Sequence, residues 1–385
     1  MHPSASRKAA APRRNRSAAL LIVEIATAGL GVALVAAAVA ANQLWLDRHF
    51  LPSFFIPRQW YVRIETIVRL VVGVAGVSIA SARWRLARLI LRMPGTVLQV
   101  VVAAVLAVAA SELALRWTHP RPTEWLVAEV EPRRQVDPQF GWVLAPSRTG
   151  RSVVAGRTIE YAIDHAGYRV RRVDEPVDRE HVAVVFAGES VMFGEGLTWE
   201  ESIPAQAGAM LGVQNANLAV HGYSTDQMYL RLERELPHFR QPIAVVSIFM
   251  TELFGRNLDR DRPHLAPGLV WRPAEHASRV ASLARLLVPY RRDETVEQGV
   301  RMTRDVLRAI VQLAHARRAA SLIVVPQFGR EDDSQRALRE RILGEDLPQL
   351  LVPLDPQWRL SWDRHPNARA AQVIATAIAA RLHRQ

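Results

Sequence analysis

The segment His181–Gly196 reads HVAVVFAGESVMFGEG, and it decides the fold that we predict for this chain. Its first part, His181–Phe186, is almost continuously apolar and β-branched, which is typical of a strand buried on both faces of a parallel sheet. Gly188 then permits a sharp turn before Glu189 and Ser190. Parallel sheets carry their chemistry at the carboxyl ends of their strands, so Ser190 is a candidate nucleophile. The alternative, that Ser190 only caps the following helix, fits this segment equally well.

Strand-like and helix-like segments alternate from His181 to the end of the chain. This alternation predicts an α/β fold, in which helices sandwich a mostly parallel five-stranded sheet. We expect a β-rich lead-in over residues 117–180 and the main domain over 181–385. The expected strands are His181–Phe186, Asn215–Val220, Ile243–Phe249, Ser321–Pro326 and Leu350–Leu354, and the expected helices are Trp199–Leu211, Thr225–Leu236, Val296–Ala316, Ser334–Leu343 and Asn367–Leu382.

The composition of the 385 residues excludes several classes of protein. The chain has no cysteine, which rules out disulfide frameworks and thiolate metal sites. Its net charge of +12 comes almost entirely from arginine, with Lys8 as the single lysine, and no basic stripe interleaved with aromatic residues is present. We therefore expect no nucleic-acid partner. Much of the positive charge instead flanks apolar segments, which points to a lipid bilayer as a partner.

The first 116 residues have the pattern of a membrane region. Residues 1–17 form a basic tail, and residues 18–41 make an apolar run long enough to cross a bilayer core of about 30 Å. Residues 64–82 form a weaker second span and residues 97–115 a third. The connector between the first two spans is rich in aromatic residues, as is typical of the membrane–water interface.

The distribution of basic residues predicts the orientation of these spans. Five basic residues lie in the tail and four in Arg83–Arg92, against three in the longer aromatic connector. The positive-inside rule then places the tail in the cytoplasm and everything after Leu115 outside it. We accordingly expect a multi-pass protein of a bacterial-type inner (cytoplasmic) membrane with an extracytoplasmic main domain. If residues 64–82 do not span, that domain is cytoplasmic instead.

A histidine and a carboxylate that could serve Ser190 lie just before the last predicted helix. The loop reads Trp362-Asp363-Arg364-His365-Pro366-Asn367, with the two side chains two residues apart. A serine nucleophile needs a base, and the base needs a carboxylate that orients it. A lone Asp-x-His would more often be an ordinary helix-preceding turn, but a serine at a strand end gives Asp363 and His365 a role.

The turn after the second predicted strand offers a further group. The segment Leu218-Ala219-Val220-His221-Gly222-Tyr223 runs from a strand end into a glycine turn. The backbone N–H of Gly222 could point into the site and stabilise an oxyanion. A glycine needed only for the geometry of the turn is an equally good interpretation.

Three segments together resemble successive motifs of the SGNH (GDSL) hydrolase superfamily: Phe186–Gly194, Asn217–Tyr223 and Asp363–Asn367. The resemblance covers roughly residues 135–385. It implies a flavodoxin-like three-layer α/β/α fold that hydrolyses or transfers acyl esters without a metal or other cofactor. It also implies that Ser190 is the nucleophile and one oxyanion donor through its N–H, that Gly222 is a second donor, and that His365 is the base, with Asp363 as its partner.

The chain departs from the motifs of this superfamily at two places. Glu189 precedes the serine where the family usually has Asp, and Thr251 and Glu252 follow the third strand where the family usually has an Asn-Asp pair. The missing Asn would complete the oxyanion hole, and losing such a donor typically costs about 10²–10³ in rate. Thr251 or Asn257 are candidate replacements. The remaining histidines lack metal-ligand spacing, which favours surface or loop positions for His221, His238, His264 and His276.

These features favour a membrane-anchored esterase or O-acyltransferase that acts on acyl esters, such as acetyl esters, of extracytoplasmic glycans or lipids. The second hypothesis is a catalytically degenerate relative that binds a glycan or helps to assemble an envelope complex. A channel or carrier formed by the spans is disfavoured, because their charged residues, Glu24, Arg69 and Glu112, lie near helix ends. The sequence does not indicate an oligomeric state.

Overall fold

Two compact units make up the part of the chain that the structure describes. The computed structural model describes residues 18–384 apart from 52, 53, 55, 119–130, 155, 276, 277 and 283–289, so the predicted basic tail lies outside it. The first unit joins Met1–Trp45 to Val62–Ala110, and the second joins Leu46–Tyr61 to Ser111–Gln385. The aromatic connector between the first two predicted spans therefore belongs to the second unit.

Three helices are long and apolar enough to cross a membrane, and they coincide with the predicted spans. Two of them approach closely in the first unit, since a Cβ atom on Gly31 would lie 2.6 Å from the backbone oxygen of Gly76. Small residues permit such approaches between apolar helices. The helices of this N-terminal region are α1 (Ala18–Ala40), α2 (Gln43–His49), α3 (Arg58–Ser81), α4 (Arg83–Arg92) and α5 (Pro94–Thr118), of which α1, α3 and α5 are the candidate spans.

The second unit is built on an eight-stranded sheet in the order β12-β11-β8-β6-β7-β5-β4-β3. Its first five strands are mutually parallel, which confirms the predicted parallel core. In chain order these strands are arranged 2-1-3-4-5, the flavodoxin-like order. Their bounds are β6 (Val182–Phe186), β7 (Gln214–Asn217), β8 (Gln241–Ile248), β11 (Ala320–Phe328) and β12 (Gln349–Leu354).

The lead-in contributes more to this sheet than the sequence predicts. Its strands β3 (Arg148–Val154), β4 (Arg157–Ile163) and β5 (Arg169–Val170) extend the sheet in antiparallel fashion, and β5 pairs with β7 through Arg169 and Asn217. The sheet is therefore mixed. Two hairpins stand apart from it, β1 (Arg134–Asp137) with β2 (Gly141–Leu144), and β9 (His264–Ala266) with β10 (Val270–Arg272).

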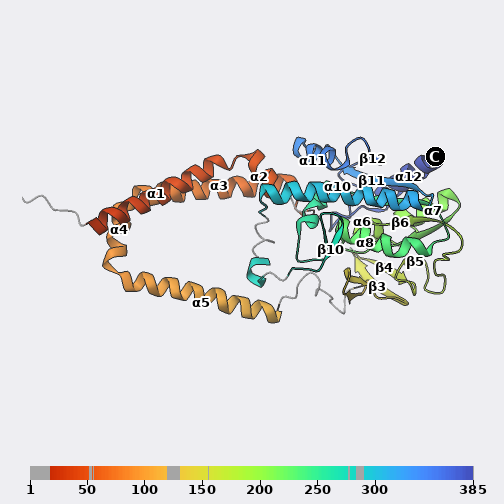
Figure 1. Cartoon of the computed structure of the whole chain (residues 1–385), viewed down its shortest axis with the longest axis horizontal. Helices are drawn as coiled ribbons and strands as arrows, with labels where there is room; N and C mark the ends of the chain where they lie inside the picture. The colour runs from red at the N-terminus through yellow and green to blue at the C-terminus, as the bar shows by residue number, and fades with distance from the viewer. Residues whose placement is uncertain are drawn as a thin grey trace, which may run out of the picture. The chain divides into compact units, whose positions relative to one another are not determined.

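Helices cover both faces of the parallel strands (Figure 1). The chain steps from β6 to β7 in one direction and from β7 through β8 to β12 in the other, and right-handed crossovers then place the connecting helices on opposite faces. Accordingly, α7 packs against α12, while α10 packs against α8 and α11. The helices of this unit are α6 (Ser190–Phe193), α7 (Ile203–Leu211), α8 (Thr225–Glu235), α10 (Asp293–Ala316), α11 (Asp333–Leu343) and α12 (Ala368–Leu382), with 3₁₀ turns η1 (Leu236–His238) and η2 (Thr251–Leu258).

The reversal of strand order between β6 and β8 opens a crevice at the carboxyl end of the sheet. Such a switch point is where open α/β sheets bind their ligands. The last residues of β6 are fully buried, and the strand is immediately followed by the segment that carries Ser190. The fold therefore brings the candidate nucleophile to the expected place.

Candidate active site

Ser190 is held at the end of β6 by a turn that only glycine can make. A Cβ atom on Gly188 would lie 2.6 Å from Cβ of Met192 and 2.8 Å from Cγ2 of Ile248, closer than real atoms approach. The backbone oxygen of Gly188 accepts a hydrogen bond from the N–H of Val220 at 3.2 Å, which ties the turn to the segment after β7. Ser190 is then the first residue of the short helix α6 and is only 5% exposed.

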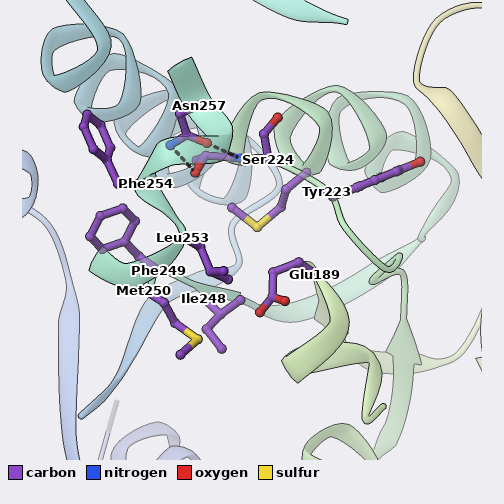
Figure 2. A pocket seen from close by; sticks show the side chains of 12 residues that line it. Glu189, Tyr223, Ser224, Ile248, Phe249, Met250, Leu253, Phe254 and Asn257 are labelled. Carbon is purple, nitrogen blue, oxygen red and sulfur yellow. Dashed lines mark hydrogen bonds between the residues drawn. The ribbon is translucent and has the colours of Figure 1, made fainter. Parts of the chain in front are cut away.

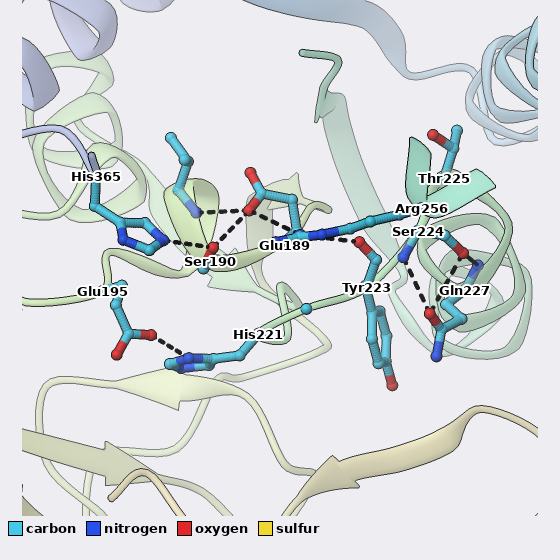
Figure 3. A network of polar contacts seen from close by, with 12 residues as sticks. Glu189, Ser190, Glu195, His221, Tyr223, Ser224, Thr225, Gln227, Arg256 and His365 are labelled. Atoms are coloured by element: carbon cyan, nitrogen blue, oxygen red, sulfur yellow. Dashed lines mark hydrogen bonds and ion pairs between the residues drawn. The ribbon is translucent and has the colours of Figure 1, made fainter. Parts of the chain in front are cut away.

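The helix cap at this position is Glu189 and not Ser190. The carboxylate of Glu189 accepts a hydrogen bond from the N–H of Val191 at 3.2 Å. The hydroxyl of Ser190 has other contacts, lying 2.7 Å from Oε2 of Glu189 and 2.7 Å from Nε2 of His365 (Figure 3). The structure therefore does not bear out the interpretation of Ser190 as a capping residue.

Asp363 and His365 lie in one hydrogen-bonded line with Ser190. Nδ1 of His365 is 2.7 Å from Oδ2 of Asp363, and Nε2 on the opposite side of the ring faces the serine. The imidazole is 5% exposed. These contacts join residues that are 175 positions apart in the chain, and they have the geometry that proton transfer from a serine hydroxyl requires.

The loop that carries the histidine is fixed by its own backbone. The N–H of Leu360 donates to the oxygen of His365 at 2.8 Å, and the N–H of Asn367 donates to the oxygen of Trp358 at 3.1 Å. Asn367 then caps α12 by accepting a hydrogen bond from Ala370 at 3.1 Å. The imidazole is thereby held in place from both ends of the loop.

Asp363 has the electrostatic properties of an orienting carboxylate. Burial raises its pKa, but the hydrogen bond and charge of His365 lower it, together with the backbone N–H groups of Arg364 and His365. The net effect holds the pKa of Asp363 below its ordinary value. The carboxylate is therefore ionised at neutral pH and can stabilise an imidazolium on His365.

The turn that carries Gly222 follows β7. Gly222 has a φ of +73°, a conformation that favours glycine. The backbone oxygen of His221 accepts a hydrogen bond from Nε1 of Trp142 at 2.8 Å, and the oxygen of Gly222 accepts one from Arg262 at 2.6 Å. With both carbonyl groups held in this way, the turn keeps a fixed orientation.

The two candidate replacements for the missing Asn, Thr251 and Asn257, both belong to η2. Thr251 lies with Glu252 in a hollow beside the end of β11, whereas Gly188 and Glu189 line a different hollow. Asn257 uses its amide group elsewhere, because Nδ2 donates to Thr225 Oγ1 and Thr303 Oγ1, each at 2.9 Å. Its oxygen accepts the N–H of Thr225 at 2.9 Å. In this structure the side chain of Asn257 ties η2 to α8 and α10.

A cation that the sequence reasoning missed lies beside Glu189. Arg256, from η2, has Nη1 at 3.7 Å from Oε2 of Glu189 and 3.5 Å from the backbone oxygen of Tyr223. Burial lowers the pKa of Arg256 to about 10, so the guanidinium remains charged at neutral pH. No motif marks this arginine, since it is one of many in a long irregular segment of an arginine-rich chain.

A second imidazole–carboxylate pair lies close to the site. His221 Nδ1 contacts Oε2 of Glu195, and the His221 ring lies 4.1 Å from that of Phe193 (Figure 3). Burial raises the pKa of Glu195, but the charges of His221 and His365 and the hydrogen bond with His221 lower it below the ordinary value. The side chain of His221 is thus largely enclosed, which the sequence interpretation of a simple surface or loop histidine did not anticipate.

Phe54 is the other residue that the sequence reasoning missed. Its ring is 3% exposed and meets the His365 ring edge to face, with centroids 5.2 Å apart. Arg364 strengthens the contact by donating from Nη1 to the backbone oxygen of Ile56 at 3.0 Å. The aromatic connector was expected to lie at the membrane interface, and a contact with the candidate base is not visible from its composition.

An apolar hollow opens next to Glu189 (Figure 2). Ile248, Met250 and Leu253 contribute to its wall, together with Met228 and Phe254.

No family model and no curated protein matches this chain. Solved structures do match, and a member of the lipolytic protein G-D-S-L family from Veillonella parvula DSM 2008 is 12% identical, with a TM-score of 0.32 over 53% of this chain and 100% of that one. LAE5, an alpha/beta hydrolase enzyme from the metagenome of Lake Arreo, Spain, is 17% identical, with a TM-score of 0.35 over 53% and 95%.

An acyltransferase is also among the similar structures. The salicylyl-acyltransferase SsfX3 from a tetracycline biosynthetic pathway is 13% identical, with a TM-score of 0.27 over 53% of this chain and 54% of that one. G-D-S-L lipolytic proteins and an acyltransferase are thus among the structures that are similar to this chain.

Proposed function

We propose that the chain is a serine esterase or O-acyltransferase in which Ser190, His365 and Asp363 act as a catalytic triad. The observation that carries this proposal is the unbroken line of hydrogen bonds, 2.7 Å from Ser190 Oγ to His365 Nε2 and 2.7 Å from His365 Nδ1 to Asp363. Ser190 Oγ has one proton and two neighbouring acceptors, His365 and Glu189. In the reactive arrangement the hydroxyl donates to His365.

The first half of the reaction transfers the acyl group to the enzyme. Ser190 Oγ attacks the ester carbonyl carbon while His365 Nε2 takes the hydroxyl proton and Asp363 stabilises the imidazolium. The N–H of Ser190 is free for the oxyanion because the first N–H groups of a helix have no partner within it. The N–H of Gly222 is the second donor. When the intermediate collapses, the alcohol leaves with the proton from His365.

The second half of the reaction decides between hydrolysis and transfer. Water or an acceptor hydroxyl gives its proton to His365 and attacks the acyl-enzyme, which releases a free acid or a new ester. Both outcomes use the same residues. A small acyl group such as acetyl is the substrate that we propose.

The three candidate spans support a membrane-anchored enzyme. The bias of basic residues toward the tail and the α4 region, with five and four of them, favours an extracytoplasmic position for the second unit. Substrates of that compartment with acyl esters are glycans and lipids. We therefore propose acylated glycans or lipids at the outer face of a bacterial-type cytoplasmic membrane.

The test of this function is covalent labelling of Ser190 in the full-length chain in detergent. A fluorophosphonate probe should label the wild type, and Ser190→Ala should abolish the label. Ser247→Ala is a matched control, since Ser247 is fully buried in β8 and has no catalytic part in this proposal. A wild type that hydrolyses no p-nitrophenyl acetate and takes no label would overturn the proposal.

A second function, binding without turnover, is favoured by one observation: the amide of Asn257, a candidate oxyanion donor, is bonded to Thr225 and Thr303. Such a protein would hold an acylated glycan or assemble an envelope complex. Cells that carry Ser190→Ala in place of the wild type would then behave as the wild type does, whereas deletion would give a phenotype. An enzyme gives the opposite result, with Ser190→Ala equivalent to deletion.

A further inference from the structure

We propose that Arg256 stabilises the oxyanion directly, in the place that the missing amide side chain leaves open. This inference rests on the proposed esterase or acyltransferase function and names a further catalytic residue for it. The remaining oxyanion donors, the N–H groups of Ser190 and Gly222, carry no net charge. Arg256 adds a positive one.

The position of Arg256 supports this role. Its Nη1 lies 3.7 Å from Glu189, the neighbour of Ser190, and 3.5 Å from the backbone oxygen of Tyr223, the neighbour of Gly222. The guanidinium thus spans the two segments that present the backbone donors (Figure 3). The side chain is only 19% exposed, so water screens its charge weakly.

The ion pair with Glu189 is loose enough to be rearranged. A separation of 3.7 Å between Nη1 and Oε2 exceeds hydrogen-bond distance, whereas the same oxygen of Glu189 lies 2.7 Å from Ser190 Oγ. Arg256 therefore remains available for a new negative charge. In the resting enzyme the carboxylate of Glu189 compensates the positive charge of Arg256, so the guanidinium is not buried without a counter-ion.

The attack step creates the charge that Arg256 would meet. Ser190 Oγ forms a bond to the carbonyl carbon, the π electron pair of the carbonyl moves onto its oxygen, and the hydroxyl proton passes to His365 Nε2. The new oxyanion lies between the Ser190 and Gly222 segments, where Arg256 supplies N–H donors and a full positive charge. On collapse the pair returns to the carbonyl and the alcohol leaves with the proton, so Arg256 gains and loses no atom.

A purely structural role for Arg256, neutralising Glu189, makes a different prediction. In that case Arg256→Met harms the enzyme only because it leaves Glu189 buried and uncompensated. The double variant Glu189→Gln/Arg256→Met has no such charge and would regain the activity of Glu189→Gln alone. If Arg256 acts on the oxyanion, the double variant stays as slow as Arg256→Met.

The experiment measures kcat and KM on p-nitrophenyl acetate for the full chain in detergent, with thermal unfolding of each variant. We expect Arg256→Met to lower kcat by about 10²–10³ with KM little changed, as for the loss of an oxyanion donor. The double variant should have about the same kcat as Arg256→Met. Arg256→Lys keeps the charge with a shorter reach and should lose only about tenfold, since a charge without the fork retains part of the interaction.

Two results separate the failure of this inference from the failure of the function. If the wild type shows no turnover and takes no fluorophosphonate label, the proposed esterase or acyltransferase function is overturned. A labelled, active wild type whose double variant matches Glu189→Gln overturns the role of Arg256 alone. If Arg256→Met unfolds, the double variant and Arg256→Lys decide the question, because neither leaves an uncompensated carboxylate.

Discussion

The site has a proton-transfer side and an oxyanion side, and only the first follows the pattern of its motifs. On the proton-transfer side, His365 lies between Ser190 and Asp363 with 2.7 Å contacts on both sides of the ring. On the oxyanion side, Thr251 lines a different hollow from Glu189, the amide of Asn257 bonds to Thr225 and Thr303, and a partly buried arginine from η2 lies beside Glu189. The difference teaches that the two sides of one site can change independently, because they depend on separate loops.

Two enclosed carboxyl groups of the second unit also respond differently to burial. Asp363 has a lowered pKa because hydrogen bonds and the charge of His365 outweigh its burial. Asp226, at the start of α8, has its pKa raised to about 6 by burial, which the hydrogen bond from Leu265 and the charge of Arg262 do not offset. The folded chain thus stabilises the ionised form of Asp363 and destabilises the ionised form of Asp226.

The largest expected effect is on the proton-transfer side. Asp363→Asn should lower kcat by about 10³–10⁴, since the amide no longer stabilises the imidazolium or its tautomer. Steady-state turnover of p-nitrophenyl acetate measures this loss. Asp355→Asn, an exposed carboxylate just after β12, is the control and should leave kcat unchanged. A fall of less than tenfold in Asp363→Asn would mean that the carboxylate does not orient the base.

A smaller effect is expected where the aromatic connector meets the base. Phe54→Ala removes an edge-to-face contact with His365, a kind of contact worth about 0.5–1.5 kcal/mol, so kcat should fall by about three- to tenfold. Phe50→Ala is the matched control, because Phe50 contacts the Tyr290 ring instead. Equal losses in both variants would show that the segment contributes general stability and does not act through His365.

Asn257 should affect stability and not turnover. Asn257→Ala removes three hydrogen bonds, to Thr225 and Thr303, and should lower the free energy of unfolding by about 1–3 kcal/mol while kcat stays within about threefold. Thermal unfolding and turnover of the same sample check both statements. A hundredfold fall in kcat at unchanged Tm would restore Asn257 as an oxyanion donor.

The smallest effect on turnover is expected at Asp226. A carboxyl group with a pKa of about 6 in the folded chain and 3.8 as its ordinary value costs stability as the pH rises through this range, because its charge is buried. Asp226→Asn should therefore be about 1–3 kcal/mol more stable than the wild type at pH 8 and similar to it near pH 4. Unfolding at both pH values tests the sign, and a variant less stable at pH 8 would contradict it.

The parallel core could be predicted because each strand is a continuous apolar run ending in turn residues. The same reasoning singled out Ser190, Asp363 and His365, and the structure brings these three side chains into contact. The antiparallel extension by β3, β4 and β5 was missed, since short alternating strands do not reveal which sheet they join.

The oxyanion side could not be predicted for a different reason. Asn257 was a fair candidate by type and position, but its partners, Thr225 and Thr303, come from two other helices. Arg256 is one arginine among many, and only its burial beside Glu189 distinguishes it. Contacts of this kind arise from tertiary packing and leave no local pattern.

The contact between Phe54 and His365 has a consequence for truncated versions of this protein. A soluble version made by deleting the first 117 residues would lose Phe54 along with the hydrophobic helices. If the proposed function holds, the turnover of this version would be lower than that of the full chain, however well the remaining sheet folded. Phe54 lies with His365 in the second unit although it precedes Ser111 by more than fifty residues in the chain, so this unit is not a single continuous segment.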